Sequence, residues 1–204
     1  MGPLWAPVPG WHRSFRSLSR FALTSGLALL VLLPGVAAGL SRAERVERAT
    51  GFITSQQASN GAFPAFSAVG STADAVVALV AVGDGKKPLR KALGFLERRV
   101  AGGAVVGVGL QAKVVLAAVA AGQDPRDFGG RDLVTGILSS EQPDGRLGDG
   151  TAVFDQALGV LALVAAGRTP SAASLGWLAS AQCDDGGWQY DAPAGPDDDA
   201  HCQD

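Results

Sequence analysis

Apolar runs and charged stretches alternate along the chain. Three runs consist almost entirely of Ala, Val and Leu, and each ends in a glycine: 78–83, 117–122 and 162–167. A glycine just past a periodic apolar segment is a typical helix stop. The pattern therefore predicts three apolar helices, each ending at its glycine.

The segments between these runs repeat as well. Gly51-Phe52-Ile53 returns as Gly94-Phe95-Leu96, Gly136-Ile137-Leu138 and Gly176-Trp177-Leu178, at steps of 43, 42 and 40 residues. Five residues after the second position of each copy lie Gln57, Val100, Gln142 and Gln182. A loop glycine follows each of them: Gly61, Gly103, Gly145 and Gly186. A period of this length indicates stacked supersecondary units, and the predicted unit is helix, glycine turn, helix.

The two helices of a unit differ in charge. The first helices of the first two units are charged, with Glu44, Arg45, Arg90 and Lys91 among their residues. The second helices carry one charge each and are otherwise apolar around the whole circumference: Asp74, Lys113 and Asp155. A helix that is apolar all round is buried. We therefore expect an all-α fold with outer first helices and inner second helices, stacked as a curved solenoid or a closed double ring.

Residues 1–38 have the order of a secretory signal peptide. Arg13, Arg16 and Arg20 precede an uncharged stretch at 21–40 that ends in small residues. We expect cleavage after Ala38, so that Met1 to Ala38 is removed and the protein is secreted or held at the cell surface. An uncleaved anchor is the alternative, because a stretch of this length can span a bilayer. The repeat domain is then 39–204, with repeats at about 43–85, 86–128, 129–170 and 171–204, the last incomplete.

Two segments resemble the QW motif of the prenyltransferase and squalene cyclase (terpenoid cyclase) repeat family. They are WLASAQCDDGGW at 177–188 and FITSQQASNGAF at 52–63, the latter with Phe in place of the last Trp. The resemblance implies an α/α toroid of helical hairpins of about 42 residues, here a partial ring of about three and a half repeats. The motif residues are expected to hold neighbouring repeats together: Phe52, Gln57, Gly61, Phe63, Trp177, Gln182, Gly186 and Trp188.

The resemblance also sets expectations about activity. Members of the family close the ring with five or six repeats, so we expect further repeats, self-association or a partner to complete this one. Cyclases of the family use an Asp-x-Asp-Asp general acid and aromatic walls. The sequence contains no Asp-x-Asp-Asp, and Phe154 is the single aromatic residue of the expected inner helices. We therefore predict no catalytic residues. The alternative is a terpene cyclase or prenyltransferase-type enzyme whose catalytic residues lie in the missing C-terminal repeats.

The favoured function is a secreted, non-catalytic binding module for a small molecule or an extracellular partner protein. Secreted cobalamin carriers, which are non-catalytic toroids, provide the precedent within the resemblance. Polar residues near the N-terminal ends of the inner helices are expected to line the site: Thr72, Asp74, Gln111, Lys113, Asp155 and Gln156. Helix capping and ordinary polar ends of buried helices are the alternative role for these six.

Composition and cysteine usage exclude further classes. A formal net charge of −2 gives no basic face for nucleic acid. Two cysteines are too few for a disulfide scaffold or a structural zinc module, but a Cys183–Cys202 disulfide is expected in an oxidising compartment. The acidic tail at 197–204 contains His201 beside Cys202, and adjacent side chains rarely converge on one ion. We therefore expect no metal and no cofactor.

Overall fold

The computed structural model describes residues 40–83 and 85–192. The chain divides into two units, Met1–Gly39 and Leu40–Asp204, and only the second contains described residues. The expected signal peptide and the acidic tail with His201 and Cys202 lie outside the described residues, so these expectations stay predictions. Within 40–83 and 85–192, no helix is both long enough and apolar enough to cross a membrane.

The described part of the chain is helical. It contains seven α-helices: α1 (Arg42–Ser55), α2 (Ala68–Val82), α3 (Lys86–Ala101), α4 (Val108–Ala120), α5 (Leu133–Leu138), α6 (Val153–Ala165) and α7 (Ala172–Ser180). The only β-type pairings among these residues are isolated bridges in the loops. The all-α prediction is confirmed.

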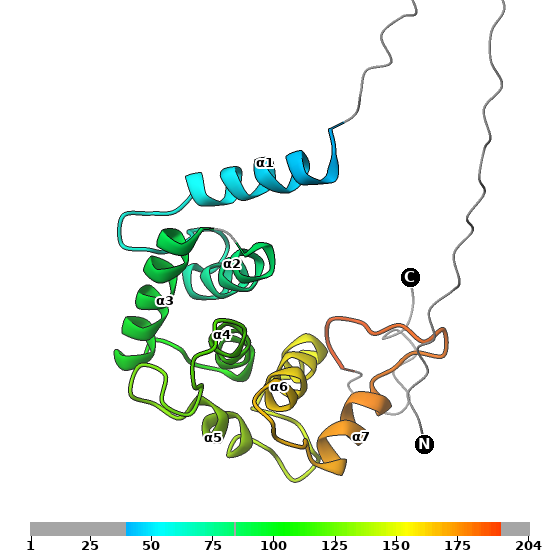
Figure 1. The fold of residues 1–204 in the computed structure, drawn as a ribbon. Helices are drawn as coiled ribbons and strands as arrows, with labels where there is room; N and C mark the ends of the chain where they lie inside the picture. Colours follow the sequence, from blue (N-terminus) through cyan, green and yellow to red (C-terminus); the bar gives the residue numbers. More distant parts are fainter. Residues whose placement is uncertain (1–39, 84, 193–204) are drawn as a thin grey trace, which may run out of the picture. The chain divides into compact units, whose positions relative to one another are not determined.

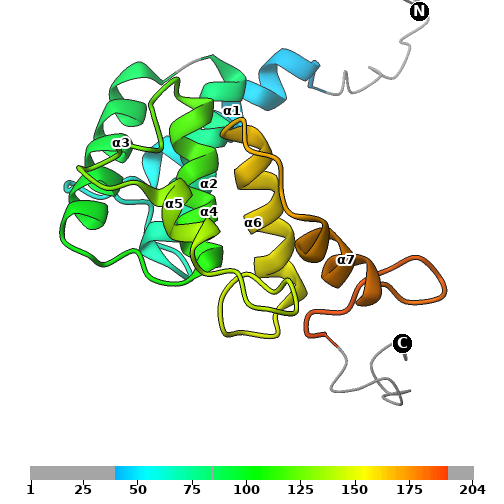
Figure 2. The same ribbon diagram turned by 90° about the horizontal axis from the view of Figure 1, so that it is seen from below.

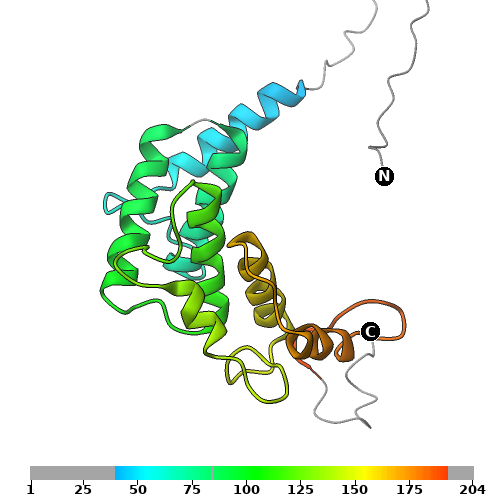
Figure 3. The ribbon, with the colours of Figure 1, turned by 60° about the horizontal axis from the view of Figure 1, so that its bottom comes forward.

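The helices lie in two alternating sets. Helix α4 packs between α2 and α6, while α3 packs on α2, α5 on α4 and α7 on α6. Figure 1 shows α2, α4 and α6 side by side, with α3, α5 and α7 to one side of them. Figures 2 and 3 show the same helices from other directions, with α7 beside α6 and α1 at the opposite end of the series. The even-numbered helices thus pack against one another, as their apolar composition predicted. Burial all round is observed for most of α4, whereas α6 leaves Leu161 and Val164 exposed.

The core follows the inner helices. Five residues of α4 have no exposed surface: Ala112, Val114, Val115, Ala117 and Ala118. Leu79 of α2 and Leu163 of α6 are buried beside them, and each fully buried Val or Leu side chain contributes about 2 kcal/mol. In α1, by contrast, Thr50 is the single buried residue. Helix α4 is therefore the centre of the described core.

Side-chain caps start four of the helices, and none of the six predicted site residues is among them. Ser41, Ser67, Asp132 and Ser171 accept hydrogen bonds from the first turns of α1, α2, α5 and α7. Helices α4 and α6 begin at Gly107 and Ala152 without such a cap. Of the alternative role, helix capping and ordinary polar ends of buried helices, the structure shows no capping by the six residues, since the N-caps of α2, α4 and α6 are Ser67, Gly107 and Ala152.

Asp132→Ala is expected to lower the free energy of unfolding by about 1 kcal/mol at neutral pH, as loss of an N-cap usually does. The backbone N–H of Thr135 donates to the Asp132 carboxylate at 2.8 Å and lowers the pKa of that group. Because the pKa of Asp132 is lower in the folded state than its unfolded value of about 3.9, the ionised cap stabilises the fold fully above that value. This contribution to the free energy of unfolding is lost as the pH falls through the folded-state pKa. Urea unfolding of both proteins from pH 7 to pH 2 measures this. A difference between them that stays constant across that range would contradict the carboxylate cap.

Candidate functional site

One charged residue from each inner helix lines a common pocket. Asp74 of α2, Lys113 of α4 and Asp155 of α6 lie around a cavity of about 430 Å³, which we call the charged pocket. Each of the three occupies the N-terminal half of its helix. The structure thus brings together half of the predicted site residues.

Lys113 occupies the middle of this group. Its Nζ donates to Asp74 Oδ2 at 2.8 Å and lies 5.7 Å from the centroid of the Phe154 ring. The Lys113 side chain is 22% exposed and that of Asp74 is 61% exposed, so the ion pair is worth less than about 1 kcal/mol. Asp74 nevertheless compensates the charge of Lys113 locally.

Asp155 supplies the uncompensated charge of the pocket. Across the described ranges, its carboxylate takes part in no hydrogen bond or ion pair, although it is only partly exposed. Its side chain lies against Gly109 of α4, where an added Cβ would be 2.1 Å from Asp155 Oδ1. Only glycine at 109 leaves room for the carboxylate in this position. The pocket therefore presents a carboxylate that is available to a ligand.

Aromatic rings border the same cavity. Phe66 is fully exposed, Tyr190 is largely exposed and Phe154 is half-exposed. An aromatic face attracts a cation through its quadrupole and also packs against apolar groups. Among residues 40–83 and 85–192, no group of three or more His, Cys, Asp or Glu side chains has a metal-binding arrangement. The charged pocket is thus lined by one carboxylate without a partner among the described residues, one ion pair and three aromatic rings.

Thr72 and Gln156 do not line the pocket, contrary to expectation. Both are buried, and both hold a loop in place. Thr72 Oγ1 accepts from Phe63 N at 2.9 Å, and Gln156 Oε1 accepts from Leu147 N at 2.7 Å. They act as internal polar groups of buried helices, which was the alternative role. Gln111, the remaining predicted residue, lines a second cavity between α4 and α5.

The loops that follow the outer helices α1, α5 and α7 form the same small hairpin. The backbone N–H groups of Ala58, Gln142 and Cys183 donate to the carbonyls of Ala62, Arg146 and Gly187 at 2.8, 2.7 and 2.9 Å. Two of these hairpins are the QW-like segments. The loop at 102–107 lacks these bonds, so the repetition is imperfect in the second unit.

A polar side chain directly before the hairpin bridges to its surroundings. Gln57 Nε2 donates to Gly61 O at 3.1 Å and to Pro88 O at 2.9 Å, the latter in the first turn of α3. Gln182 Nε2 donates to Gly186 O at 2.7 Å. In the third loop the same place is taken by Glu141, whose carboxylate accepts from the Ser171 hydroxyl at the start of α7. Gln142, which has the same distance from the preceding helix as Gln57 and Gln182 in the sequence repeat, lies one residue further along the chain.

The other motif residues differ in burial. Trp188 is 49% exposed and its Nε1 donates to Leu178 O at 2.9 Å, whereas Phe63 is buried and Phe52 is largely exposed. Trp177 is partly buried. Cys183 is disulfide-bonded, while Cys202 lies outside the described residues, so the Cys183–Cys202 pairing stays a prediction.

Comparison with known proteins adds no assignment. No protein-family model matches the chain, and no curated protein matches it.

Proposed function

We propose that this protein is a non-catalytic binding module that holds a small organic cation in the charged pocket. The observation that carries the proposal is the free carboxylate of Asp155, which faces the pocket among the rings of Phe66, Phe154 and Tyr190. An ammonium group pairs with the carboxylate, and the rest of the ligand packs on the rings.

The size and charge of the pocket fit such a ligand. A cavity of about 430 Å³ falls within the usual range for small-molecule sites, which are mostly apolar with a few placed polar groups. Two carboxylates and one ammonium leave an excess of negative charge in the lining. An anion would meet Asp155 without compensation, so a cation is favoured.

The fold and location proposed here follow from the repeats and the N-terminal sequence. Alternating inner and outer helices and three similar hairpin loops support a toroid-type repeat domain similar to the prenyltransferase and squalene cyclase family. Export as a secreted or cell-surface protein rests on the charged and apolar pattern of 1–38. The alternative of a terpene cyclase or prenyltransferase-type enzyme gains no support from the residues that the structure describes.

Asp155→Asn is expected to weaken binding of 2-phenylethylamine at least about tenfold, because a hydrogen bond to a charged group is worth about 1.5–3 kcal/mol. Isothermal titration calorimetry with the full chain measures the dissociation constant. The neutral analogue 2-phenylethanol should bind the wild type and the variant equally and weakly.

Asp127→Asn is the matched control, since Asp127 is exposed and lies outside the charged pocket. It should leave amine binding unchanged. Equal binding of the amine and the alcohol to the wild type, or an Asp155→Asn variant that binds like the wild type, would refute the proposal.

A further inference from the structure

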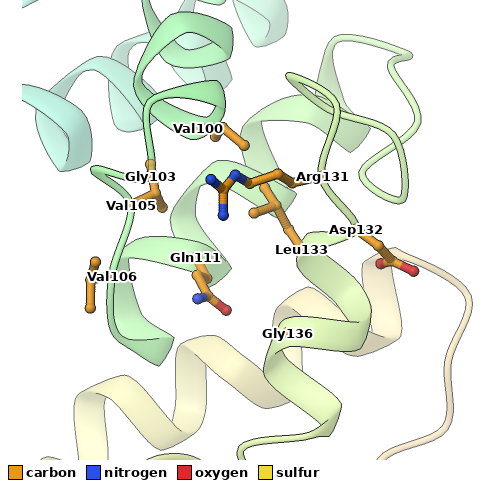
Figure 4. Close-up of a pocket in the computed structure, with 9 residues that line it drawn as sticks. All are labelled: Val100, Gly103, Val105, Val106, Gln111, Arg131, Asp132, Leu133 and Gly136. Carbon is orange, nitrogen blue, oxygen red and sulfur yellow. The ribbon is translucent and has the colours of Figure 1, made fainter.

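A second cavity lies between the loop 102–107 and the start of α5. It has a volume of about 430 Å³, and we call it the arginine pocket. Figure 4 shows the side chains of Arg131 and Gln111 directed into it. Val100, Val105 and Leu133 provide apolar walls. Its polar side chains differ from those of the charged pocket.

The cavity exists where the repeat is imperfect. In the first and third units, Thr72 and Gln156 of the inner helices accept hydrogen bonds from the residue two positions after the loop glycine. Gln111 has the same place in α4 relative to the repeat, but within the described ranges its side chain makes no hydrogen bond. The short loop 102–107 also has no hairpin, and Arg99 instead of a glutamine stands four residues before its glycine, Gly103. A polar side chain that is used internally in the other units is therefore available here.

Arg131 gives the cavity its charge. Its guanidinium forms no ion pair and no hydrogen bond with any residue of the described part. The neighbouring Asp132 carboxylate accepts hydrogen bonds from the backbone N–H and the hydroxyl of Thr135, and in Figure 4 it is directed away from the Arg131 guanidinium. Asp132 also lines the cavity, but within the described residues its carboxylate does not pair with Arg131, so the guanidinium has no partner among them.

Gly136 fixes where the amide of Gln111 lies. An added Cβ at Gly136 would be 2.9 Å from Gln111 Oε1, so the glycine lets the amide rest against α5. In Figure 4 the amide nitrogen lies on the side of the Gln111 amide away from Gly136. The amide of Gln111 on α4 and the guanidinium of Arg131, two residues before α5, thus line one cavity with apolar walls.

We propose that the arginine pocket binds a compact carboxylate with an apolar body. The guanidinium of Arg131 donates to both carboxylate oxygens, a geometry that a planar fork matches better than an ammonium does. The amide of Gln111 donates one further hydrogen bond, and the valine and leucine walls cover the apolar part. This proposal does not rest on the proposed cation site, although Val106 lines both pockets. A free carboxylic acid and the C-terminal carboxylate of a protein chain share this chemistry.

The test is calorimetric titration of the full chain with 4-methylpentanoate and with its neutral analogue 4-methylpentanamide. The acid is expected to bind at least about tenfold more tightly than the amide. Arg131→Gln should remove this preference for the acid, and Arg131→Lys should retain only part of it. Arg168→Gln is the matched control, since Arg168 is exposed and outside the pocket, and it should bind like the wild type.

Gly136→Ala tests the role of Gln111 without touching either donor. The new methyl group displaces the amide at the end of a flexible side chain, so the fold should be retained and carboxylate binding should weaken about threefold. Circular dichroism checks the fold. Unchanged binding in this variant would overturn the part assigned to Gln111.

A pair of tripeptides, acetyl-Ala-Ala-Leu with a free carboxylate and with an amidated C-terminus, distinguishes the two sources. Binding of the free-carboxylate peptide supports a protein C-terminus, and binding of 4-methylpentanoate alone supports a free acid. The proposal is overturned if neither carboxylate binds, if Arg131→Gln binds like the wild type, or if inorganic phosphate competes as well as the carboxylate.

Discussion

Gly145→Ala should lower the free energy of unfolding by about 3 kcal/mol or more. Gly145 has a φ of +92°, and a methyl group on it would lie 2.2 Å from the carbonyl oxygen of Ala173. That oxygen belongs to the backbone of α7, so it cannot rotate out of the way as a side chain can. Either the hairpin loop or α7 must move, and the contact between the third hairpin and α7 is lost. Urea unfolding followed by circular dichroism measures the loss.

Gly186→Ala is the matched control for this prediction. Gly186 has nearly the same φ, +90°, in the equivalent loop, but its nearest described neighbour is Gln182 Nε2 at 3.9 Å. The substitution should therefore cost only the left-handed backbone strain of about 1–2 kcal/mol. Equal losses at 145 and 186 would show that backbone strain alone explains both, and that close docking on the next helix contributes nothing.

The same comparison extends to the first loop. Gly61 has a φ of +97°, and an added Cβ would lie 2.2 Å from the carbonyl oxygen of Lys91 in α3. The first and third hairpins thus dock through a glycine on the backbone of the following outer helix. This recurrent contact gives the glycines of the sequence repeat a physical reason that their spacing alone did not provide.

The layering of the helices was predictable from single residues. Helices α2, α4 and α6 carry one charge each among Ala, Val and Leu, and such helices are expected to pack against one another. The prediction of burial holds best for α4, since α2 and α6 leave Val82 and Leu161 exposed. Their place near the N-terminal ends of the inner helices led to the expectation that Asp74, Lys113 and Asp155 line one site. The structure places all three on one pocket.

Polar residues close to these charges were harder to interpret. Thr72 and Asp74 are two positions apart, which places them about 200° apart around the helix. The Thr72 side chain therefore faces the core and the Asp74 side chain faces the charged pocket. A list of polar positions near the start of a helix does not distinguish these two orientations. Helical periodicity applied to each helix would have separated Thr72 from Asp74.

The bridging residue of the third loop was missed for a different reason. Counting five residues from Ile137 leads to Gln142, but the hairpin places Glu141 four residues before its glycine, as Gln57 and Gln182 are. The register follows the hydrogen bonds of the hairpin and not the distance from the preceding helix. The arginine pocket was equally inaccessible, because it arises where that hairpin is lacking and not from a motif.

Gln156→Met is expected to destabilise the protein by about 3 kcal/mol or more, because it leaves several buried polar groups without partners at once. Gln156 is 2% exposed. Its Oε1 accepts from Leu147 N at 2.7 Å, and its Nε2 donates to Gly145 O at 3.1 Å and to Ser174 O at 3.0 Å. Methionine preserves the volume but none of these hydrogen bonds. One side chain of α6 thus joins the third hairpin loop to α7.

The measurement is urea unfolding together with amide hydrogen exchange. The Leu147 amide should exchange faster in Gln156→Met than global destabilisation alone explains, since its acceptor is gone. Gln182→Met is the control, because Gln182 is exposed and makes one side-chain bond, to Gly186 O; its cost should stay within about 1 kcal/mol. Equal losses for the two variants would mean that the buried network contributes no more than an exposed bond. A larger loss at Gln156 would assign the connection between α6, α7 and the loop to this single amide.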